Sequence, residues 1–393
     1  MKKLFHNPWT FVSFIQSVIL VIACYFLWNG SKNFINNFRL QQDLILWEYR
    51  NRMTEPLDSD LYLINTGYDK VMLPAIDSFG FQLGERPITD REKLYKLLSL
   101  LANSNSYKYI ILDINFDTSF VTPIDSALFS LIASMRDIVV PSNTSGTGIP
   151  RQLSQKSGIA EFKASRKDMD FHRYQYIVKG KESIALKIWK EQTQGEFSKK
   201  WYGYTMNGKL CLNYSRISFP SAFIQYADEG REDGNYYVEQ YNNLGEDILS
   251  KVGLLGDLSV FFDNKFVVIG DMIDDVHDTM VGPVPGPLII YNAYLSLLDE
   301  HNVVPLWVWI TIFVAFCISS FYTFEIICPL RSVKPFGKFM LSFVGYSLVF
   351  SVLGLIIYSI THILLNVAVI SVFFTLETTI FKVTRKSSNP LKS

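Results

Sequence analysis

The chain has 393 residues, of which 49% are hydrophobic and 15% aromatic, and its 37 basic residues balance its 37 acidic residues. This composition is too apolar for a disordered chain, and the zero net charge gives no general affinity for nucleic acid. It suits a membrane protein that carries one sizeable folded domain. The four cysteines include no CxxC pair, which argues against zinc binding and against thioredoxin-like redox chemistry.

The first apolar segment, residues 9–28, has about 20 residues, which is the length of a helix that crosses a bilayer. Basic residues precede it, and a tryptophan stands at each end, as membrane-interface anchors do. A cleaved signal peptide is the alternative, because such peptides also begin with basic residues before an apolar core. The length and the tryptophans favour an uncleaved span within residues 1–29. Residues 31–49 then predict a stalk helix, with a helix packed on the domain as the alternative.

Strands and helices alternate through the central part of the chain, residues 30–304. The predicted strands are residues 60–65, 109–114, 137–140, 173–178, 210–214 and 266–269. The predicted helices are residues 89–101, 125–135, 183–189 and 288–298. This alternation favours an α/β fold, with a mixed but largely parallel sheet flanked by helices. The polar, glycine-rich stretch 228–246 predicts a long exposed loop.

Residues 266–305 join a buried strand, an acidic loop, a helix and the start of an apolar segment. The strand closes at Gly270, and the glycines and prolines of 282–287 predict that no regular element crosses them. Pro287 suits the first turn of the helix that follows. The loop in between holds the candidate residues Asp271, Asp274, Asp275, His277 and Asp278.

Two further acids, Asp113 and Asp117, stand at the carboxyl end of the predicted strand 109–114. Open α/β sheets bind ligands at that edge, so we expect both acids to line one ligand-binding crevice with the acidic loop. The alternative is structural, with carboxylates that accept hydrogen bonds from nearby backbone amides. A divalent cation held by Asp274, Asp275, His277 and Asp278 is a further alternative, because hard oxygen ligands gather there, but the loop lacks the spacing of a calcium-binding EF-hand. The chain has no phosphate-binding loop, and neither a metal ion nor a cofactor is assigned. No G-x-S-x-G elbow accompanies the acids, so no catalytic residue is assigned.

Three more apolar segments, residues 306–324, 339–358 and 363–381, predict three further membrane spans within 305–382. Basic residues lie between the first two of these and in the tail 383–393, whereas the turn between the last two is uncharged. By the positive-inside rule, both termini face the cytoplasm and the central domain lies outside it. Glu377 in the last segment is a functional candidate, and pairing with Lys382 at the interface is its alternative.

Four segments resemble, in the right order, those of the type-two CHASE domain, an extracytoplasmic sensory module of bacterial cyclases, histidine kinases and serine/threonine kinases. They are GFQLGERPITDREKLYKLLSLL, KYIILDINF, KLCLNYSRISFPSAF and FVVIGDMIDDVHDTMVGPVPGPLIIYNAYLSLL. The chain departs from the family pattern at Met280, where proline is usual, and at Tyr291, where histidine often begins a His-Ala-Asn motif. The resemblance implies a multi-pass protein of the bacterial inner membrane, with a sensory domain outside the cytoplasm.

Members of that family continue into a cyclase or kinase domain after the third late span, and no such motif follows residue 381 here. We therefore expect a non-enzymatic sensor that binds an unknown small ligand or partner and signals through its membrane helices to a separate protein, with a homodimer as a further arrangement. The first alternative is a structural subunit of an envelope complex. The second is an extracytoplasmic hydrolase that uses Asp113 and the acidic loop.

Overall fold

The computed structural model describes residues 8–29, 60–76, 79, 81–116, 121–143, 149–160, 173–216, 241–250, 259–279, 282–322, 335–361 and 370–375. These residues form two compact units. The sheet unit comprises the described parts of 46–197 and 213–300, and the helical unit comprises those of 1–45, 198–212 and 301–393. The predicted stalk, Asp117 and Glu377 lie outside the described residues.

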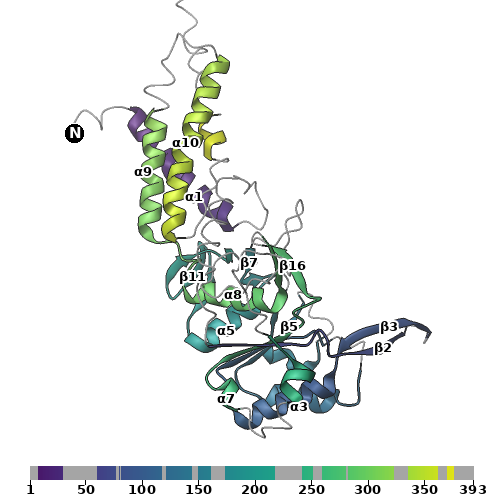
Figure 1. The fold of residues 1–393 in the computed structure, drawn as a ribbon. Helices are drawn as coiled ribbons and strands as arrows, with labels where there is room; N and C mark the ends of the chain where they lie inside the picture. Colours follow the sequence, from purple (N-terminus) through teal and green to yellow (C-terminus); the bar gives the residue numbers. More distant parts are fainter. Residues whose placement is uncertain are drawn as a thin grey trace, which may run out of the picture. The chain divides into compact units, whose positions relative to one another are not determined.

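Six parallel strands form the centre of the sheet unit, in the spatial order β14-β1-β15-β4-β5-β6 (Figure 1). Their bounds are β1 Leu61–Asn65, β4 Tyr109–Asp113, β5 Ile138–Ser142, β6 Ser157–Ile159, β14 Tyr241–Asn243 and β15 Phe266–Gly270. The predicted α/β fold with a largely parallel sheet is therefore confirmed. Strand β15 is the last of the six in the chain, yet it lies between β1 and β4, with Val268 opposite both Leu63 and Ile111.

Helices cover both faces of this sheet, which explains why its inner strands are almost continuously apolar. One face packs Ile110, Leu112, Val267 and Ile269 into a buried core. The elements over this face are α3 Arg91–Ser104, α4 Asp125–Ser134, α7 Ser259–Phe262 and the short turns η1 Arg151–Lys156 and η2 Leu244–Leu249. The side chain of Asp90 caps α3 by accepting hydrogen bonds from the backbone amides of residues 92 and 93.

The opposite face packs against α5 Ile184–Thr193 and α8 Gly286–Leu298. Aromatic rings fill this layer, with the Phe266 ring centroid 5.5 Å from that of Tyr291 and 5.1 Å from that of Tyr294. Pro287 lies in the first turn of α8, as predicted, although the helix begins at Gly286. The helices predicted at 89–101, 125–135 and 183–189 are also confirmed, within a few residues at their ends.

Three sequence predictions about the irregular regions are wrong. The segment 282–287 does form a regular element, because β17 Gly282–Pro285 pairs with β16 Val276–Thr279 in a two-stranded ribbon, and edge strands tolerate proline. The segment 228–246 is not only a loop, because its end forms the edge strand β14 and begins η2. The strand predicted at 173–178 is broken at Tyr176, where β7 Arg173–Gln175 pairs with β13 Tyr214–Arg216 and β8 Ile177–Val178 with β9 Lys181–Glu182.

The largest element that was not predicted is a β-hairpin. Strands β2 Lys70–Ile76 and β3 Gln82–Thr89 form an antiparallel hairpin that projects from the sheet unit (Figure 1). Pro74, Gly84 and Pro87 interrupt both strands, which hides them from a pattern search. The base of the hairpin is closed by the Asp90 amide, which donates to the Asp69 carbonyl over 2.8 Å.

The helical unit contains α1 Pro8–Asn29, α9 Leu306–Tyr322 and α10 Pro335–Thr361. In the part of the chain that the structure describes, one helix segment, Phe343–Thr361, is long and apolar enough to cross a membrane. The described apolar parts of α1 and α9 are shorter than that, and of the segment predicted at 363–381 only residues 370–375 are described, as helix. One of the four predicted spans is therefore matched by a helix of sufficient length. A small sheet of β10 Phe197–Lys200, β11 Gly203–Met206 and β12 Lys209–Cys211 completes the unit, so the strand predicted at 210–214 is split between β12 and β13.

Candidate functional site

The carboxyl ends of β14, β1, β15 and β4 meet at one edge of the sheet, because the strands are parallel. Asn65, at the end of β1, is fully buried there and joins three strands. Its side-chain nitrogen donates to Asn243 Oδ1 over 2.9 Å, and its oxygen accepts from the amides of Gly67 at 2.9 Å and Met272 at 3.0 Å. No local pattern reveals this role, because an isolated asparagine after a strand has many uses.

Asp271 and Asp274 form an ion cluster with Lys70, the first residue of the β2–β3 hairpin. The Lys70 ammonium lies 2.7 Å from Asp271 Oδ2 and also contacts the Asp274 carboxylate. Burial alone would raise the pKa of Asp271, but Lys70 and the backbone amides of Ile273 and Asp274 hold it below its ordinary value. Asp271 therefore stays charged, and the contacts of Lys70 with both acids fix the base of the hairpin to the end of β15.

Asp113, Asp275 and His277 form a second group at the same edge. Burial, together with the nearby charge of Asp275, raises the pKa of Asp113 from an ordinary value of 3.8 to about 7, and His277 opposes this rise. His277 Nε2 lies 3.0 Å from Asp275 Oδ1. A β-carbon on Gly286 would lie 2.3 Å from Asp275 Oδ2, so only glycine lets α8 begin this close to the acid.

The predicted site residues therefore separate into groups instead of lining one crevice. Asp113, Asp275 and His277 interact with one another, whereas Asp274 belongs to the Lys70 cluster. Asp278 is exposed and, one residue along β16 from His277, lies on the other side of that strand. Among the described residues, no group of three or more His, Cys, Asp or Glu side chains is arranged to hold a metal ion.

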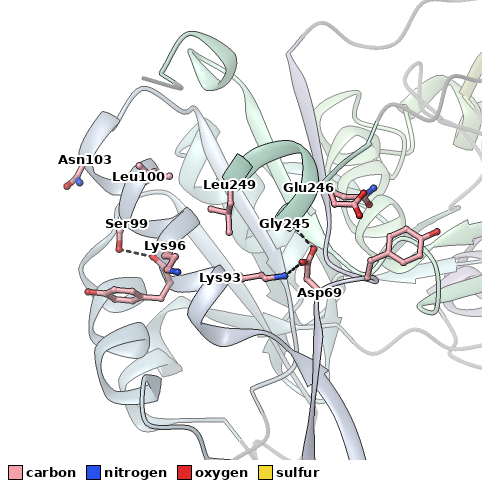
Figure 2. Close-up of a pocket in the computed structure, with 12 residues that line it drawn as sticks. Asp69, Lys93, Lys96, Ser99, Leu100, Asn103, Gly245, Glu246 and Leu249 are labelled. Carbon is pink, nitrogen blue, oxygen red and sulfur yellow. Dashed lines mark hydrogen bonds and ion pairs between the residues drawn. The ribbon is translucent and has the colours of Figure 1, made fainter. Parts of the chain in front are cut away.

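A pocket of about 750 Å³ lies at the same carboxyl edge, at the ends of β14 and β1 (Figure 2). Three segments supply its walls: the turn after β1, the outer side of α3 and the turn η2. The lining residues are Tyr68, Asp69, Lys93, Tyr95, Lys96, Ser99, Leu100, Asn103, Asn243, Gly245, Glu246 and Leu249. Both charged and apolar side chains face this space, as in sites that orient a small molecule by a few polar contacts.

An ion pair between buried Asp69 and half-exposed Lys93 fixes one wall of the pocket. Asp69 is 5% exposed, and its Oδ1 accepts a hydrogen bond from Lys93 Nζ over 2.6 Å, while its Oδ2 accepts from the Gly245 amide over 3.0 Å (Figure 2). The hydrogen bond from Lys93 to Asp69 raises the pKa of Lys93, and the charges of Asp90 and Glu246 add to it. This pair therefore holds α3, η2 and the turn after β1 in one arrangement, with Lys96 and Glu246 as further charges of opposite sign.

The turn η2 is a π-helical turn, a wound segment that is rare in proteins and frequent at functional sites. The backbone amide of Asn243 donates to the Asp247 carboxylate over 2.8 Å, which fixes the entry to this turn. Sequence reasoning assigned the start of this segment to an exposed loop and so missed the pocket. The sequence did contain one signal for this turn. Asn243 and Asp247 are four residues apart, and the apolar residues Ile248 and Leu249 follow them.

Comparisons with protein-family models, with curated proteins and with solved structures find no match. The resemblance of four segments to the type-two CHASE domain therefore stays a prediction. The functional evidence that remains is the geometry of the carboxyl edge, with its two ionic groups and its pocket.

Proposed function

We propose that this chain is a membrane-anchored binding protein whose sheet unit takes a small ligand in the pocket between α3 and η2. The observation that carries the proposal is the pocket itself, which begins at Asp69 and Gly245 on the edge where parallel α/β sheets bind ligands and follows the outer side of α3. Its walls come from segments far apart in the chain, so a ligand between them would favour one arrangement of α3, η2 and the turn after β1. Such a protein acts as a sensor and passes the change to a separate signalling or envelope protein.

The surfaces of the apolar helices support the membrane anchor. Along α10 the side chains at every fourth position are more than half exposed and apolar, namely Val344, Leu348, Val352, Ile356 and Ile360. Inside the helical unit, by contrast, Ser17 is buried and Ser320 Oγ donates to Gln16 Oε1 over 2.9 Å. Helices that span a lipid bilayer expose apolar side chains to lipid and place small polar side chains between helices. A large exposed apolar surface of this kind is unusual in a protein surrounded by water.

The full anchor in this proposal has four spans, one before the sheet unit and three after it. Helix α1 has 22 residues, or roughly 33 Å at about 1.5 Å per residue, and its described apolar part, Phe11–Phe26, is the shorter middle of that length. The charge distribution of the loops favours both termini in the cytoplasm and the sheet unit in the periplasm or outside the cell. A type-two CHASE-like sensory domain in a bacterial inner membrane has this arrangement.

A second candidate function follows from Asp113. A carboxyl group whose pKa lies near 7 is suited to exchange protons in general acid–base catalysis. Asp275 and His277 beside it would then make an extracytoplasmic hydrolase, with Asp113 as the acid or base. Turnover that disappears in an Asp113→Asn variant would favour this candidate over the sensor.

Ligand binding in the pocket is expected to raise the melting temperature of the full-length protein in detergent. The probes are free amino acids, dicarboxylates and inorganic phosphate at millimolar concentration, and a probe present at 100 times its Kd stabilises the folded state by about 2.7 kcal/mol. Lys96→Met and Glu246→Gln are expected to remove the shift, because these residues supply charge to the pocket. Lys181→Met, an exposed change in β9 outside the pocket, is the matched control and should keep it. If no probe gives a shift that depends on the pocket residues, the pocket is not the ligand site.

The membrane topology has its own test. A cysteine introduced at Asn143 should react with a membrane-impermeant thiol reagent applied to intact spheroplasts, because the sheet unit is expected outside the cytoplasm. Reporter tags at Met1 and Ser393 should both be cytosolic. Termini on opposite sides of the bilayer, or a cytosolic residue 143, would contradict the four-span anchor.

A further inference from the structure

The turn between β10 and β11 presents a basic and aromatic tip. Trp201 is 94% exposed and Tyr202 43% exposed, and their ring centroids lie 5.4 Å apart in an edge-to-face arrangement. Lys199 and Lys200, immediately before them, are also exposed. A tryptophan this exposed needs an explanation, because large aromatic side chains are usually buried in a fold or an interface.

This tip is attached firmly to the ends of two apolar helices of the same unit. The Tyr204 amide donates to Tyr25 Oη of α1 over 3.1 Å. A β-carbon on Gly203 would lie 1.7 Å from that same oxygen, so glycine is required for the contact. On the other side, Leu212 N donates to the Asn302 carbonyl over 2.8 Å, just before α9 begins.

The helix ends beside the tip are themselves aromatic. The ring of Tyr25 lies 5.8 Å from that of Trp309 in the first turn of α9, and Trp307 in the same turn is 40% exposed. Helices α1 and α9 run antiparallel, because Gln16 meets Ser320 while Tyr25, farther along α1, meets Trp309. The end of α1 and the start of α9 are therefore at one level, and β11 lies beside that end (Figure 1).

We propose that residues 199–202 dock on the head-group region of the bilayer, with Trp201 and Tyr202 inserted at the interface and Lys199 and Lys200 against anionic phospholipid. Indole and phenol rings favour the membrane interface, where one end is apolar and the other is hydrated. Lysines near the surface of an anionic leaflet are attracted to it. This inference rests on the proposed membrane anchor, because the tip reaches lipid only if α1 and α9 span the bilayer.

A lipid surface fits the tip better than a protein partner does. The tip joins one class of residue that prefers the interface with one that pairs with phosphate, and it is held at the level where apolar helices end. A protein interface would have no reason to follow the helix ends. Docking would also hold the β10–β12 sheet against the bilayer. The chain would then be fixed to the membrane at this tip as well as through α1 and α9.

The test uses the full chain in vesicles that contain anionic lipid and a lipid with a nitroxide near its head group. The difference in emission between the natural protein and a Trp201→Phe variant isolates Trp201, which is expected to be blue-shifted and strongly quenched. Trp189, 3% exposed in the sheet unit, gives the matched control through Trp189→Phe, and its emission is expected to be unquenched. Trp201 emission typical of indole in water, without quenching, would overturn the inference.

The lysines are tested in the same assay. Lys199→Gln and Lys200→Gln are expected to weaken docking by roughly five-fold each on anionic vesicles and to have no effect on zwitterionic ones. Equal effects on both kinds of vesicle would exclude pairing with anionic lipid. If the whole chain does not float with vesicles after carbonate extraction, the proposed membrane anchor is wrong. If the chain floats but Trp201 is not quenched, only the inference about residues 199–202 is wrong.

Discussion

Replacing Arg91 by alanine is expected to lower the free energy of unfolding of the sheet unit by about 3–5 kcal/mol, which is a large part of the stability of a typical domain. The side chains of Arg91 and Asp125 are 3% and 8% exposed, and the Arg91 guanidinium donates to Asp125 Oδ2. The guanidinium also lies 5.9 Å from the ring centroid of Phe116 and 6.0 Å from that of Phe129. Its removal leaves a buried carboxylate without its cation and a void between two aromatic rings.

The Arg91–Asp125 pair also makes stability depend on pH. Burial alone would raise the pKa of Asp125, but hydrogen bonds from Arg91 and Thr122 outweigh burial and lower it. Because the folded-state pKa lies below the unfolded one, the stabilisation is complete above the unfolded value and is lost as pH falls through the folded value. Urea unfolding at several pH values measures both the loss in Arg91→Ala and its acid dependence.

The matched control is the double variant Arg91→Met, Asp125→Leu, which replaces both charges by apolar groups of similar size. It is expected to be far closer to the natural protein in stability than Arg91→Ala, because neither charge is left alone in the core. If the single and double variants lose the same amount, the loss comes from packing and not from the unpaired carboxylate.

Asp113→Asn is expected to stabilise the protein at pH 8, by about 2–4 kcal/mol, although it removes a charged side chain. Partial burial and the nearby charge of Asp275 raise the pKa of Asp113 to about 7 in the folded chain, against an ordinary value of 3.8. The folded state therefore binds this proton more tightly than the unfolded state, and stability falls as pH rises from about 4 to about 7. The difference between the two pKa values corresponds to ~4 kcal/mol at most.

Chemical unfolding of Asp113→Asn between pH 4 and pH 8 checks this sign. The variant should show a flatter dependence of stability on pH than the natural protein, with the gain confined to the upper part of the range. Asp278→Asn is the matched control, because it makes the same chemical change at an exposed position of β16. Parallel curves for the natural protein and Asp113→Asn would show that Asp113 does not titrate in this range.

Those parts of the sheet unit that depend on local signals were predictable from the sequence. The strands at 109–114 and 266–269 are continuous apolar runs because helices bury both faces, and Asp90 marks the start of α3 as a capping residue. The edge strand β14 escaped prediction because Tyr241–Asn243 is short and polar and gains its structure only from pairing with β1. The β2–β3 hairpin was not predicted, because its prolines and glycine are residues typical of loops.

The sequence predicted that the acidic side chains gather at the carboxyl edge of the sheet, but it did not predict which of them contact one another. Because the carboxyl ends of parallel strands meet at one edge, we expected Asp113 to lie near the acidic loop. In the structure Asp113 interacts with Asp275 and His277 of that loop. Lys70, which pairs with Asp271 and Asp274, lies on the β2–β3 hairpin, and the sequence pattern did not predict that hairpin. The pocket joins residues 68–69, 93–103 and 243–249, and no local pattern relates segments that only the tertiary fold brings together.

The late position of β15 sets the order in which this protein becomes complete during synthesis. The slot between β1 and β4 is filled by residues 266–270, so it stays open until about two thirds of the polypeptide has left the ribosome. Until then β1 and β4 expose apolar edges that no earlier strand of the sheet closes. Long sequence separation between paired strands slows folding, so we expect the centre of this sheet to form late.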